Sequence, residues 1–464
     1  MDINEIIDLN GKSAEEIIAA LKQKSIEVPQ WGGKRGLKAE YDPTMHPVMD
    51  RGRYPDLVNS DGTPDYVTRI TYDLQRLAVK RMTELCNGIP VKRIYTPQND
   101  KQKVIATALE SIYQRNRINS VNIERNNMLF ASCEVMTLWY AVEQPTQYGD
   151  VKSNLKLRCA NYSPMLGDEL YPLFDEQGDL IALSVSYRRK VGKRTVDFFD
   201  AYTSDRHIKW STNDGSYGVI EDEQHTVGKI PGIYMWRPKP IWENSSNIVY
   251  ELEWAMSRNG NYLRKNSKPL FVVMADEQIA YGDEKTETQE ARAVLQYPKG
   301  STAQYVTWAQ AVENLRFYCD SLRQSFFTQL QLPDWNYEKM SQMALSGESR
   351  KQLFIDAQMK VKDESGRLEE FYSREVNVVK QFLIIIMGES YAADIHALPV
   401  EIEITPFSIS DEKDTISNLY LANGGKPLMS HRESVEQLGW SQDVDETMRQ
   451  IEEDQMRDAF EPTM

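Results

Sequence analysis

The fold is decided by two helical patterns, WAQAVENLRFYCDSLRQSFFTQLQLP at Trp308–Pro333 and ESRKQLFIDAQMKVKDESGRLEEFYSREVNVVKQFLIIIM at Glu348–Met387. In both patterns apolar residues recur at steps of three and four, which places them on one face of a helix. The first face holds Val312, Leu315, Cys319, Leu322, Phe326 and Leu330, and the second holds Leu353, Ala357, Val361, Leu368, Tyr372, Val376, Val379, Leu383 and Ile386. Pro333 lacks a backbone amide, so we expect it to end the first helix.

The second pattern contains no proline and predicts a helix of unusual length, from about Glu348 to Met387. At about 1.5 Å per residue such a helix is roughly 60 Å long. Helices of globular proteins average about 11–12 residues. A helix of this length more often spans an assembly, or packs against copies of itself, than lies inside one small domain. A long core helix of a large enzyme is the alternative.

The composition is that of an ordinary folded protein. The chain has 464 residues, 41% of them hydrophobic and 27% charged, which allows two or three domains with cores of their own. The apolar run Phe382–Met387 is far shorter than the roughly 20 residues that a bilayer requires. Met1–Ser13 carries acidic residues and no basic cluster, so we expect no secretory signal, no membrane partner and a cytoplasmic site of synthesis.

The net charge of −15 restricts how the chain can meet nucleic acid. Proteins that hold DNA through its phosphates present a basic surface, because each neutralised phosphate releases counterions and adds affinity. This chain has the opposite balance. If DNA is a partner, we expect the protein to let DNA pass and not to grip it.

No pattern of catalytic or metal-binding residues is found. Four cysteines (Cys86, Cys133, Cys159 and Cys319) form no C-x-x-C pair, which argues against a disulfide framework or a zinc site and predicts small buried side chains. Five histidines (His46, His207, His225, His396 and His431) show no metalloprotease spacing, and there is no G-x-S-x-G motif. Carboxylate pairs such as Glu369-Glu370 are typical of solvated helix surfaces. The sequence therefore predicts no enzyme activity, no cofactor and no metal.

The first half of the chain is predicted to be an α+β domain. Ser13 and Glu16 form a capping-box pattern at the start of a helix. A phosphate-binding loop ending at Gly11-Lys12-Ser13 is disfavoured because Ile6 stands where its first glycine is needed. Helices are expected at Thr68–Asn87 and from Asp100 to about Asn126. Short β-patterned runs separated by Gly and Asp turns then continue to Trp236 and predict an antiparallel meander.

The second half is predicted to contain a stalk with a small insert at its tip. A helix capped by Ser246 ends at Pro269, and the insert before Trp308 has strand patterns at Leu270–Met274 and near Val294–Tyr297, with an acidic loop between them. After the long helix, Leu398–Ile404 alternates as a strand, which we expect to return to the sheet of the first domain. The tail Asp411–Phe460 is predicted to be helical and acidic.

The order of these parts resembles the portal protein of tailed double-stranded DNA bacteriophages. The segments that carry the resemblance are Gly88-Ile-Pro-Val91, Gly228-Lys-Ile-Pro-Gly-Ile233, the helix Tyr250–Asn259, Ser346-Gly347, and the tail elements Leu428-Met-Ser430 and Asp445–Asp454. They follow one another in the family's order over nearly the whole chain. Glu348-Ser349 departs from the small or apolar residues that relatives tend to have after Ser346-Gly347.

The resemblance implies a fold and a division of the chain. The fold class is α+β, with an α+β wing, a two-helix stem, a small α/β clip, one very long helix and a helical crown. The implied parts are the wing (1–245), stem helices (246–267 and 309–332), the clip (268–308), the tunnel loop (333–346), the long wing helix (347–392), a wing return strand (393–409) and the crown with the tail (410–464).

The resemblance also implies a function and a set of partners. A portal of this kind is a ring of twelve subunits at one capsid vertex of the virion, assembled in the host cytoplasm, through which DNA is packaged and ejected. Its implied partners are further copies of itself, the terminase large subunit, the head-tail adaptor, the major capsid and scaffolding proteins, and double-stranded DNA. A head-to-tail adaptor, and a nucleic-acid-processing enzyme, are the alternatives.

Three groups of site residues follow from the same resemblance. Those of the tunnel loop, expected to line the DNA channel, are Trp335, Asn336, Tyr337, Lys339, Met340 and Met343. Those of the clip, expected to contact terminase and adaptor, are Asp283, Glu284, Glu287 and Glu290. Those expected to pack the stem are Leu252, Leu315, Leu322 and Phe326.

Overall fold

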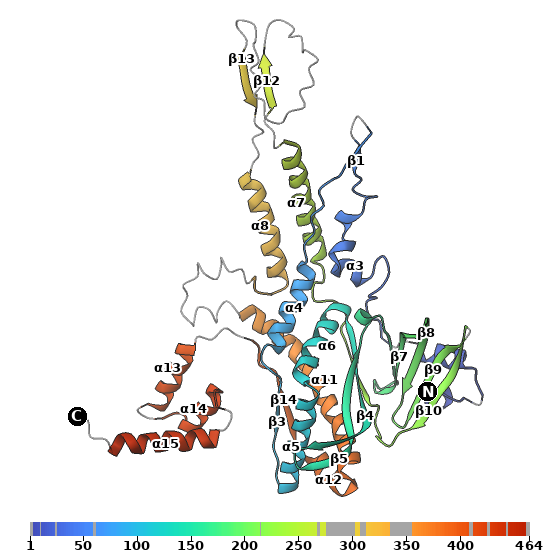
Figure 1. Ribbon diagram of the computed structural model, residues 1–464, viewed down its shortest axis with the longest axis vertical. Coiled ribbons are helices and arrows are strands. Elements are labelled where there is room, and N and C mark those ends of the chain that lie inside the picture. The colour runs from blue at the N-terminus through green and yellow to red at the C-terminus, as the bar shows by residue number, and fades with distance from the viewer. Residues whose placement is uncertain are drawn as a thin grey trace.

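The structure is a computed structural model that describes residues 3–9, 11–23, 26–58, 62–213, 215–266, 270–274, 302–306, 312–334, 355–407, 412–424, 427–441 and 444–460. A mixed body of helices and sheets carries a two-helix stalk, and three C-terminal helices lie to one side of the body (Figure 1). The predicted α+β class is confirmed. None of the described helices is long and apolar enough to cross a membrane.

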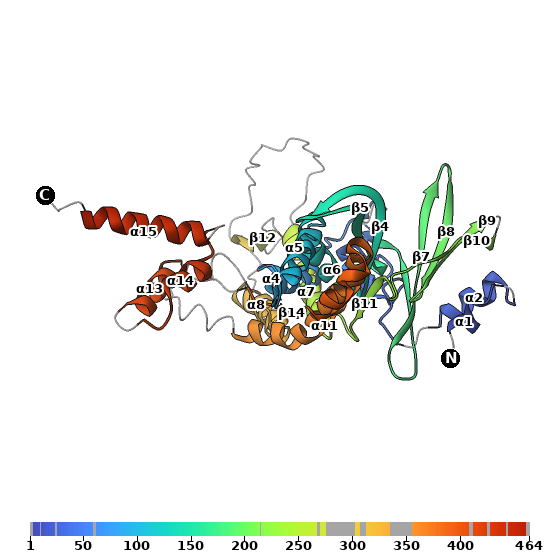
Figure 2. The ribbon, with the colours of Figure 1, turned by 90° about the horizontal axis from the view of Figure 1, so that it is seen from below.

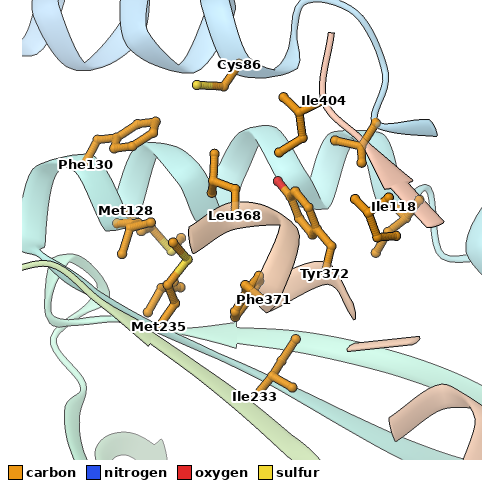
Figure 3. Close-up of a cluster of buried hydrophobic side chains, with 14 of the residues drawn as sticks. Cys86, Ile118, Met128, Phe130, Ile233, Met235, Leu368, Phe371, Tyr372 and Ile404 are labelled. Carbon is orange, nitrogen blue, oxygen red and sulfur yellow. The ribbon is translucent and has the colours of Figure 1, made fainter. Parts of the chain in front are cut away.

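Helix α11 (Ile355–Met387) runs through the centre of the body, as its long apolar stripe predicts. Its side chains pack between helices α4 (Leu74–Asn87) and α6 (Ile118–Ser132) on one side and a sheet on the other (Figure 3). Tyr372 and Leu368 are completely buried there. The described part of the predicted helix therefore forms, and it ends at Met387 because Gly388 adopts a positive φ of 93°.

Two predicted helix boundaries in this region were wrong. The expected single helix from Asp100 to about Asn126 is two helices, α5 (Asp100–Arg115) and α6, separated at Arg117, which adopts a left-handed φ of 51°. The expected helix at Thr68–Asn87 begins only at Leu74. Residues 68–72 do not join the helix, because the backbone amides of Thr68, Ile70 and Tyr72 bond to side chains of a neighbouring helix, as described below.

Two antiparallel sheets make up the β part of the body. The first has the strand order β11 (Gly232–Trp236), β4 (Glu134–Tyr148), β5 (Val151–Tyr162), and α11 lies against it. The second has the order β10-β9-β8-β7-β6, so that strands consecutive in the chain are neighbours, which confirms the predicted meander. Its strands are β6 (Glu169–Phe174), β7 (Leu180–Val191), β8 (Arg194–Tyr202), β9 (Arg206–Asn213) and β10 (Ser216–Gln224).

Helices α1 (Ile3–Ile6) and α2 (Ala14–Leu21) pack against the meander (Figure 2). The predicted capping box is confirmed, since the Ser13 side chain accepts from the Glu16 amide and the Glu16 carboxylate accepts from the Ser13 amide. Ile17 and Leu21 of α2 are buried in a small core with Trp210. Gly11-Lys12-Ser13 therefore serves as a helix start.

The strand predicted after the long helix returns to the first half of the chain, but not to the meander. Strand β14 (Val400–Glu403) pairs antiparallel with β3 (Lys92–Tyr95) in a two-stranded sheet of its own. Between α11 and β14 lie the 3-10 turn η4 (Glu389–Tyr391) and the short helix α12 (Ala392–Ala397). These elements cover the end of α11 and bury Ile395 and Leu398.

The stalk consists of α7 (Ser246–Asn266) and α8 (Val312–Gln329). Beyond their far ends, β12 (Leu270–Met274) pairs antiparallel with β13 (Thr302–Val306) (Figure 1). Strand β13 was not predicted from the sequence, and the strand predicted near Val294–Tyr297 lies outside the described residues. A segment of short elements lies beside the stalk and consists of α3 (Leu37–Tyr41), the 3-10 turns η1 (Pro43–Met45) and η2 (Pro47–Met49), and the strands β1 (Leu57–Val58) and β2 (Pro64–Asp65).

The tail forms three helices, α13 (Glu412–Asn423), α14 (His431–Leu438) and α15 (Val444–Phe460), as its pattern predicts. Ser430 and Glu433 form a second capping box at the start of α14. Among the described side chains of these helices and their connections, only that of Ser434 is buried. The apolar side chains Tyr420, Leu428 and Trp440 are all more than half exposed.

Candidate functional site

The face predicted to pack the stalk joins α7 to α8 within one chain. Leu252 and Phe326 are buried, whereas Leu315 and Leu322 are half-buried, and Leu322 packs against the main core. Around them, the Cys319 Sγ lies 3.7 Å from the Met256 Sδ. The apolar stripe predicted from the sequence therefore packs α8 against α7 within one chain.

The opposite face of α7 holds an extended segment, residues 64–72, which we call the strap. The amides of Tyr72, Ile70 and Thr68 donate to the side chains of three α7 residues, Glu253 (2.8 Å), Ser257 (2.8 Å) and Asn261 (2.6 Å). Steps of four along a helix advance about 6.0 Å, and steps of two along a strand advance about 6.6–6.8 Å, so the two repeats nearly match.

Close approach of the strap requires a glycine on the helix. A Cβ atom at Gly260 would lie 3.0 Å from the Cγ2 of Thr68. At the far end of the strap, the Arg264 Nη2 donates to the Asp65 Oδ1 at 2.8 Å. The strap and α7 are thus joined along about three turns of the helix, by backbone amides toward one end and an ion pair at the other.

A buried ion pair anchors the near end of the strap. The His46 Nδ1 lies 2.7 Å from the Glu253 Oε1, the atom that also accepts from the Tyr72 amide, and both side chains are fully buried. The His46 Nε2 lies 2.8 Å from the carbonyl oxygen of Glu40. Both ring nitrogens therefore face acceptors, which only the imidazolium form can satisfy. Burial disfavours this charge, but the hydrogen bond and the charge of Glu253 outweigh burial and raise the pKa of His46.

Glu40 extends the same anchorage to the start of α7. Its Oε2 accepts from the Trp242 Nε1 at 2.8 Å and from the Ser246 Oγ at 2.7 Å. The segment from α3 to the strap is therefore bonded to the stalk both at the first residue of α7, Ser246, and about two turns further along, at Glu253.

The end of α8, where the sequence enters residues 335–354, is held by three cations. Arg81 of α4 donates to the carbonyl of Pro333, and Lys360 of α11 donates to the carbonyl of Leu330. The Arg323 Nη2 lies 3.1 Å from the Asp334 Oδ1. Carbonyls at a helix C-terminus carry partial negative charge, so cations stabilise this end. We call this cluster the loop root.

The cations of the loop root are partly removed from water. Burial, together with the nearby charge of Arg237, lowers the pKa of Lys360 to about 8. Burial also lowers the pKa of Arg81. Arg81 and Arg323 lie over the Phe327 ring, at 5.2 and 6.0 Å from its centre. Each charge is matched to a carbonyl, a carboxylate or an aromatic face, so the loop root is a fixed support.

Ion pairs also fix α11 along the body. Glu375 accepts from the Arg125 Nη1 and Nη2 at 2.7 and 2.8 Å, and both side chains are fully buried. The Trp139 Nε1 donates to the same carboxylate at 3.2 Å. Burial disfavours the charged carboxylate, but Arg125 more than compensates and lowers the pKa of Glu375. Nearer the loop root, the Arg237 Nη2 donates to the Glu364 Oε1 at 2.6 Å. Helix α11 therefore links the loop root rigidly to the sheets.

The comparison with known families covers almost the whole of this architecture. Residues 34–459 match the family described as "Phage portal protein, SPP1 Gp6-like". The chain belongs to this phage portal family. The resemblance read from the sequence is thereby confirmed, and the portal fold with it. A search of curated proteins gives no match.

Solved structures similar to this portal-family chain come from gene transfer agent (GTA) particles. They are the neck of an empty particle with C6 symmetry (11% identity, TM-score 0.43), the virion of a native particle (11%, 0.41) and the neck of a native particle with C12 symmetry (10%, 0.43). Each match covers 92% of this chain and 98% of the other.

Of the three groups of site residues predicted from the portal resemblance, the structure describes one. Leu252, Leu315, Leu322 and Phe326 lie together in the stalk, as reported above. The tunnel-loop residues Trp335, Asn336, Tyr337, Lys339, Met340 and Met343, and the clip residues Asp283, Glu284, Glu287 and Glu290, lie outside the described residues. Within the described part of the chain, no group of three or more His, Cys, Asp or Glu residues is placed to hold a metal ion.

The strap and the loop root were not predicted from the sequence of this portal-family chain. One pattern in the sequence points to the strap: Glu253, Ser257 and Asn261 recur at steps of four, so they form a polar row on a helix whose other face is apolar. The loop root has none, because Arg81 and Lys360 come from helices more than 250 residues apart in sequence.

Proposed function

We propose that this chain is the subunit of a ring of twelve that occupies one vertex of a phage capsid and serves as the conduit for DNA. The observation that carries the proposal is the family match over residues 34–459. The architecture supports it, because a stalk, a rigid long helix and a fixed loop root are the parts that a channel needs to hold a loop near its axis.

In this proposal the chain divides as the family does. The wing is 1–245 with 347–392 and the return strand 393–409, the stem is 246–267 and 309–332, the clip is 268–308, the tunnel loop is 333–346 and the crown is 410–464. The clip docks the terminase motor during packaging and the head-tail adaptor afterwards. The protein has no catalytic activity of its own, and ATP hydrolysis belongs to terminase.

The charge of the chain supports passage of DNA. A net charge of −15 per subunit repels phosphates, so a ring of such subunits does not retain DNA by non-specific attraction. At the loop root, Arg81, Arg323 and Lys360 bind protein groups and are not left to face the channel. Contact with DNA is then left to the tunnel loop, where Lys339 is the single cation between Asp334 and Ser346.

Negative-stain microscopy of the purified full-length protein tests the proposal. We expect class averages of rings with a central channel, located at a capsid vertex when the protein is assembled with its capsid and scaffolding proteins. Lys339→Ala should leave the rings intact and change packaging or DNA retention. Protein that stays monomeric in every assembly condition, or processes DNA without terminase, would contradict the proposal.

A second experiment tests the clip. Deletion of residues 283–290 should leave rings intact and impair the binding of terminase or adaptor. Loss of the rings themselves would show instead that this acidic segment is a contact between subunits.

A further inference from the structure

One flank of the stalk presents a rigid hairpin with an exposed apolar surface. The hairpin comprises residues 50–58 and 62–67, which include β1 and β2, and its exposed side chains are Leu57 (47%), Val58 (75%) and Tyr66 (58%). Leu57 and Val58 are consecutive in β1 and therefore point to opposite faces of the hairpin, so large apolar side chains are exposed on both faces. Large apolar side chains exposed on an otherwise polar surface mark a site of contact.

The hairpin is held by a small polar cluster at its base. The Asp56 Oδ1 accepts from the Val67 amide at 3.0 Å and from the Arg69 Nη1 at 2.8 Å, and the Arg69 Nη2 donates to the Tyr54 carbonyl at 2.5 Å. The Arg69 and Asp56 side chains are only 10% and 16% exposed. Since the base is fixed and continues into the strap, the apolar surface has a defined position beside the stalk.

The other flank of the stalk presents an acidic and aromatic stripe. Glu313, Phe317 and Asp320 follow one another at steps of four and three, so they share one face of α8. Phe317 is 75% exposed. This face points away from α7, because Leu315 and Cys319 occupy the face toward α7. Arg316 lies 3.8 Å from Asp320, but both side chains are more than 70% exposed, so this pair is weak.

The two flanks lie on opposite sides of α7 (Figure 1). The strap bonds to Glu253, Ser257 and Asn261, whereas α8 contacts Glu251 and Met256. In a ring built by rotation, the contact between neighbours is heterologous, so one flank of each copy meets the opposite flank of the next.

The charges of the two flanks are complementary. Arg51 and Arg53 of the hairpin are 73% and 67% exposed, and their nearest carboxylates, Asp56 and Asp50, lie at 3.9 and 3.8 Å. Such loose surface pairs are readily exchanged for new ones. Within the hairpin, Asp56 and Asp65 are paired with Arg69 and Arg264, which leaves Arg51 and Arg53 beside Asp50 as its most exposed charges. The stripe exposes Glu313 and Asp320 beside Arg316, so the exposed charges of the two flanks have a small excess of opposite sign. Opposite charges of this kind fix the register of an interface.

We propose that the hairpin of one copy docks on the Glu313, Phe317 and Asp320 face of α8 in the next copy. The partner is a second copy of this chain, and the inference rests on the proposed ring. It assigns to the hairpin a role in closing the ring at the level of the stalk, and it gives Phe317 a covered position in the assembly.

Cysteine cross-linking in the full-length protein tests the contact. Under mild oxidation, the double variant Val58→Cys/Phe317→Cys should give a ladder of covalent oligomers, because each copy can be linked on both flanks. A mixture of the two single variants should give covalent dimers only, since each copy then offers one introduced thiol; the unmodified protein, which keeps the four native cysteines, should give no ladder. Val219→Cys/Phe317→Cys is the control, because Val219 is also exposed but lies on β10, away from the stalk (Figure 1).

A charge exchange tests the register. Arg53→Glu should raise the protein concentration needed for half-maximal assembly about fivefold, the size expected for one exposed charge pair. Asp320→Arg in the same chain should restore assembly. Both positions are exposed, so far-UV circular dichroism should show unchanged folding.

The outcomes separate this inference from the proposed function. Intact rings without a 58–317 cross-link would overturn the docking of the hairpin and leave the proposed function standing. Cross-linking of Val58→Cys to a capsid or terminase protein, and not to Phe317→Cys, would assign the hairpin to that partner and likewise overturn the inference. Absence of rings in the unmodified protein would overturn both.

Discussion

Glu253→Ala is expected to detach the strap from the stalk. The Oε1 of Glu253 holds the fully buried His46 at 2.7 Å and the Tyr72 amide at 2.8 Å, so the substitution removes both partners at once. Breaking a buried ion pair costs about 3–5 kcal/mol, and leaving a buried amide without a partner costs about 1–3 kcal/mol. Because His46 can release its proton, we expect the lower end of this range, about 3 kcal/mol.

Urea-induced unfolding, followed by circular dichroism at one fixed protein concentration, measures this loss. Glu251→Ala is a matched control on the same helix, since Glu251 accepts from Tyr318 at 2.9 Å on the exposed side, and it should cost less than about 1 kcal/mol. Hydrogen exchange gives a local measure, because the amides of Thr68, Ile70 and Tyr72 should lose protection. Equal stability losses for the two variants would refute the reasoning.

The pH dependence of the same pair follows from the raised pKa of His46. The folded protein keeps this proton to a higher pH than the unfolded chain, whose ordinary pKa is about 6.5. The stabilisation is therefore fully present below about pH 6.5 and is lost as the pH rises through the folded-state pKa. After Glu253, the charged group that raises the pKa of His46 most is the carboxylate of Asp42. Glu253→Gln should remove this pH dependence, measured as the difference between variant and unmodified protein.

Three further substitutions test the supports of the long helix and the stalk. Arg125→Ala should cost about 3–5 kcal/mol in urea unfolding because it leaves the buried Glu375 carboxylate unpaired, whereas Arg374→Ala, which breaks an exposed pair, should cost less than about 1 kcal/mol. The lowered pKa of Lys360 means that the unfolded chain binds this proton more tightly than the folded protein, so the folded state should gain stability as the pH rises above about 8. Lys360→Met should abolish this gain. The Tm of the variant and of the unmodified protein, measured from pH 7 to 10, tests the expectation. Leu322→Asp places a charge in the packed face of the stalk and should reduce ring formation in size-exclusion chromatography, at a cost of several kcal/mol; fully assembled soluble rings would contradict a buried role for this face.

The sequence was sufficient where local signals and packing agree. The described part of the long helix, the capping box at Ser13 and the meander follow from periodicity, capping and turn residues that the tertiary structure also favours. The portal fold itself was identified from the order of short segments, and the family match confirms it.

The sequence was insufficient where a residue far away in the chain decides the local conformation. Residues 68–72 continue the apolar spacing of α4, yet they do not join it, because the side chains of Glu253, Ser257 and Asn261 accept hydrogen bonds from the amides of Tyr72, Ile70 and Thr68. The break between α5 and α6 has no glycine or proline, and the left-handed Arg117 gives no signal in the sequence.

The repeats of the strap and of α7 differ slightly in length. Each repeat of the strap is about 0.6–0.8 Å longer than the matching repeat of the helix, a difference that accumulates along the contact. The side chains absorb it, since the shortest acceptor, Ser257, stands in the middle and the longer Glu253 and Asn261 stand at the two ends. Because amides alternate in direction along an extended chain, a shift of one residue would present none of them to the helix. Helix α7 is therefore unable to slide past the strap in small steps, and any movement of the stalk must carry the strap and its hairpin along with it.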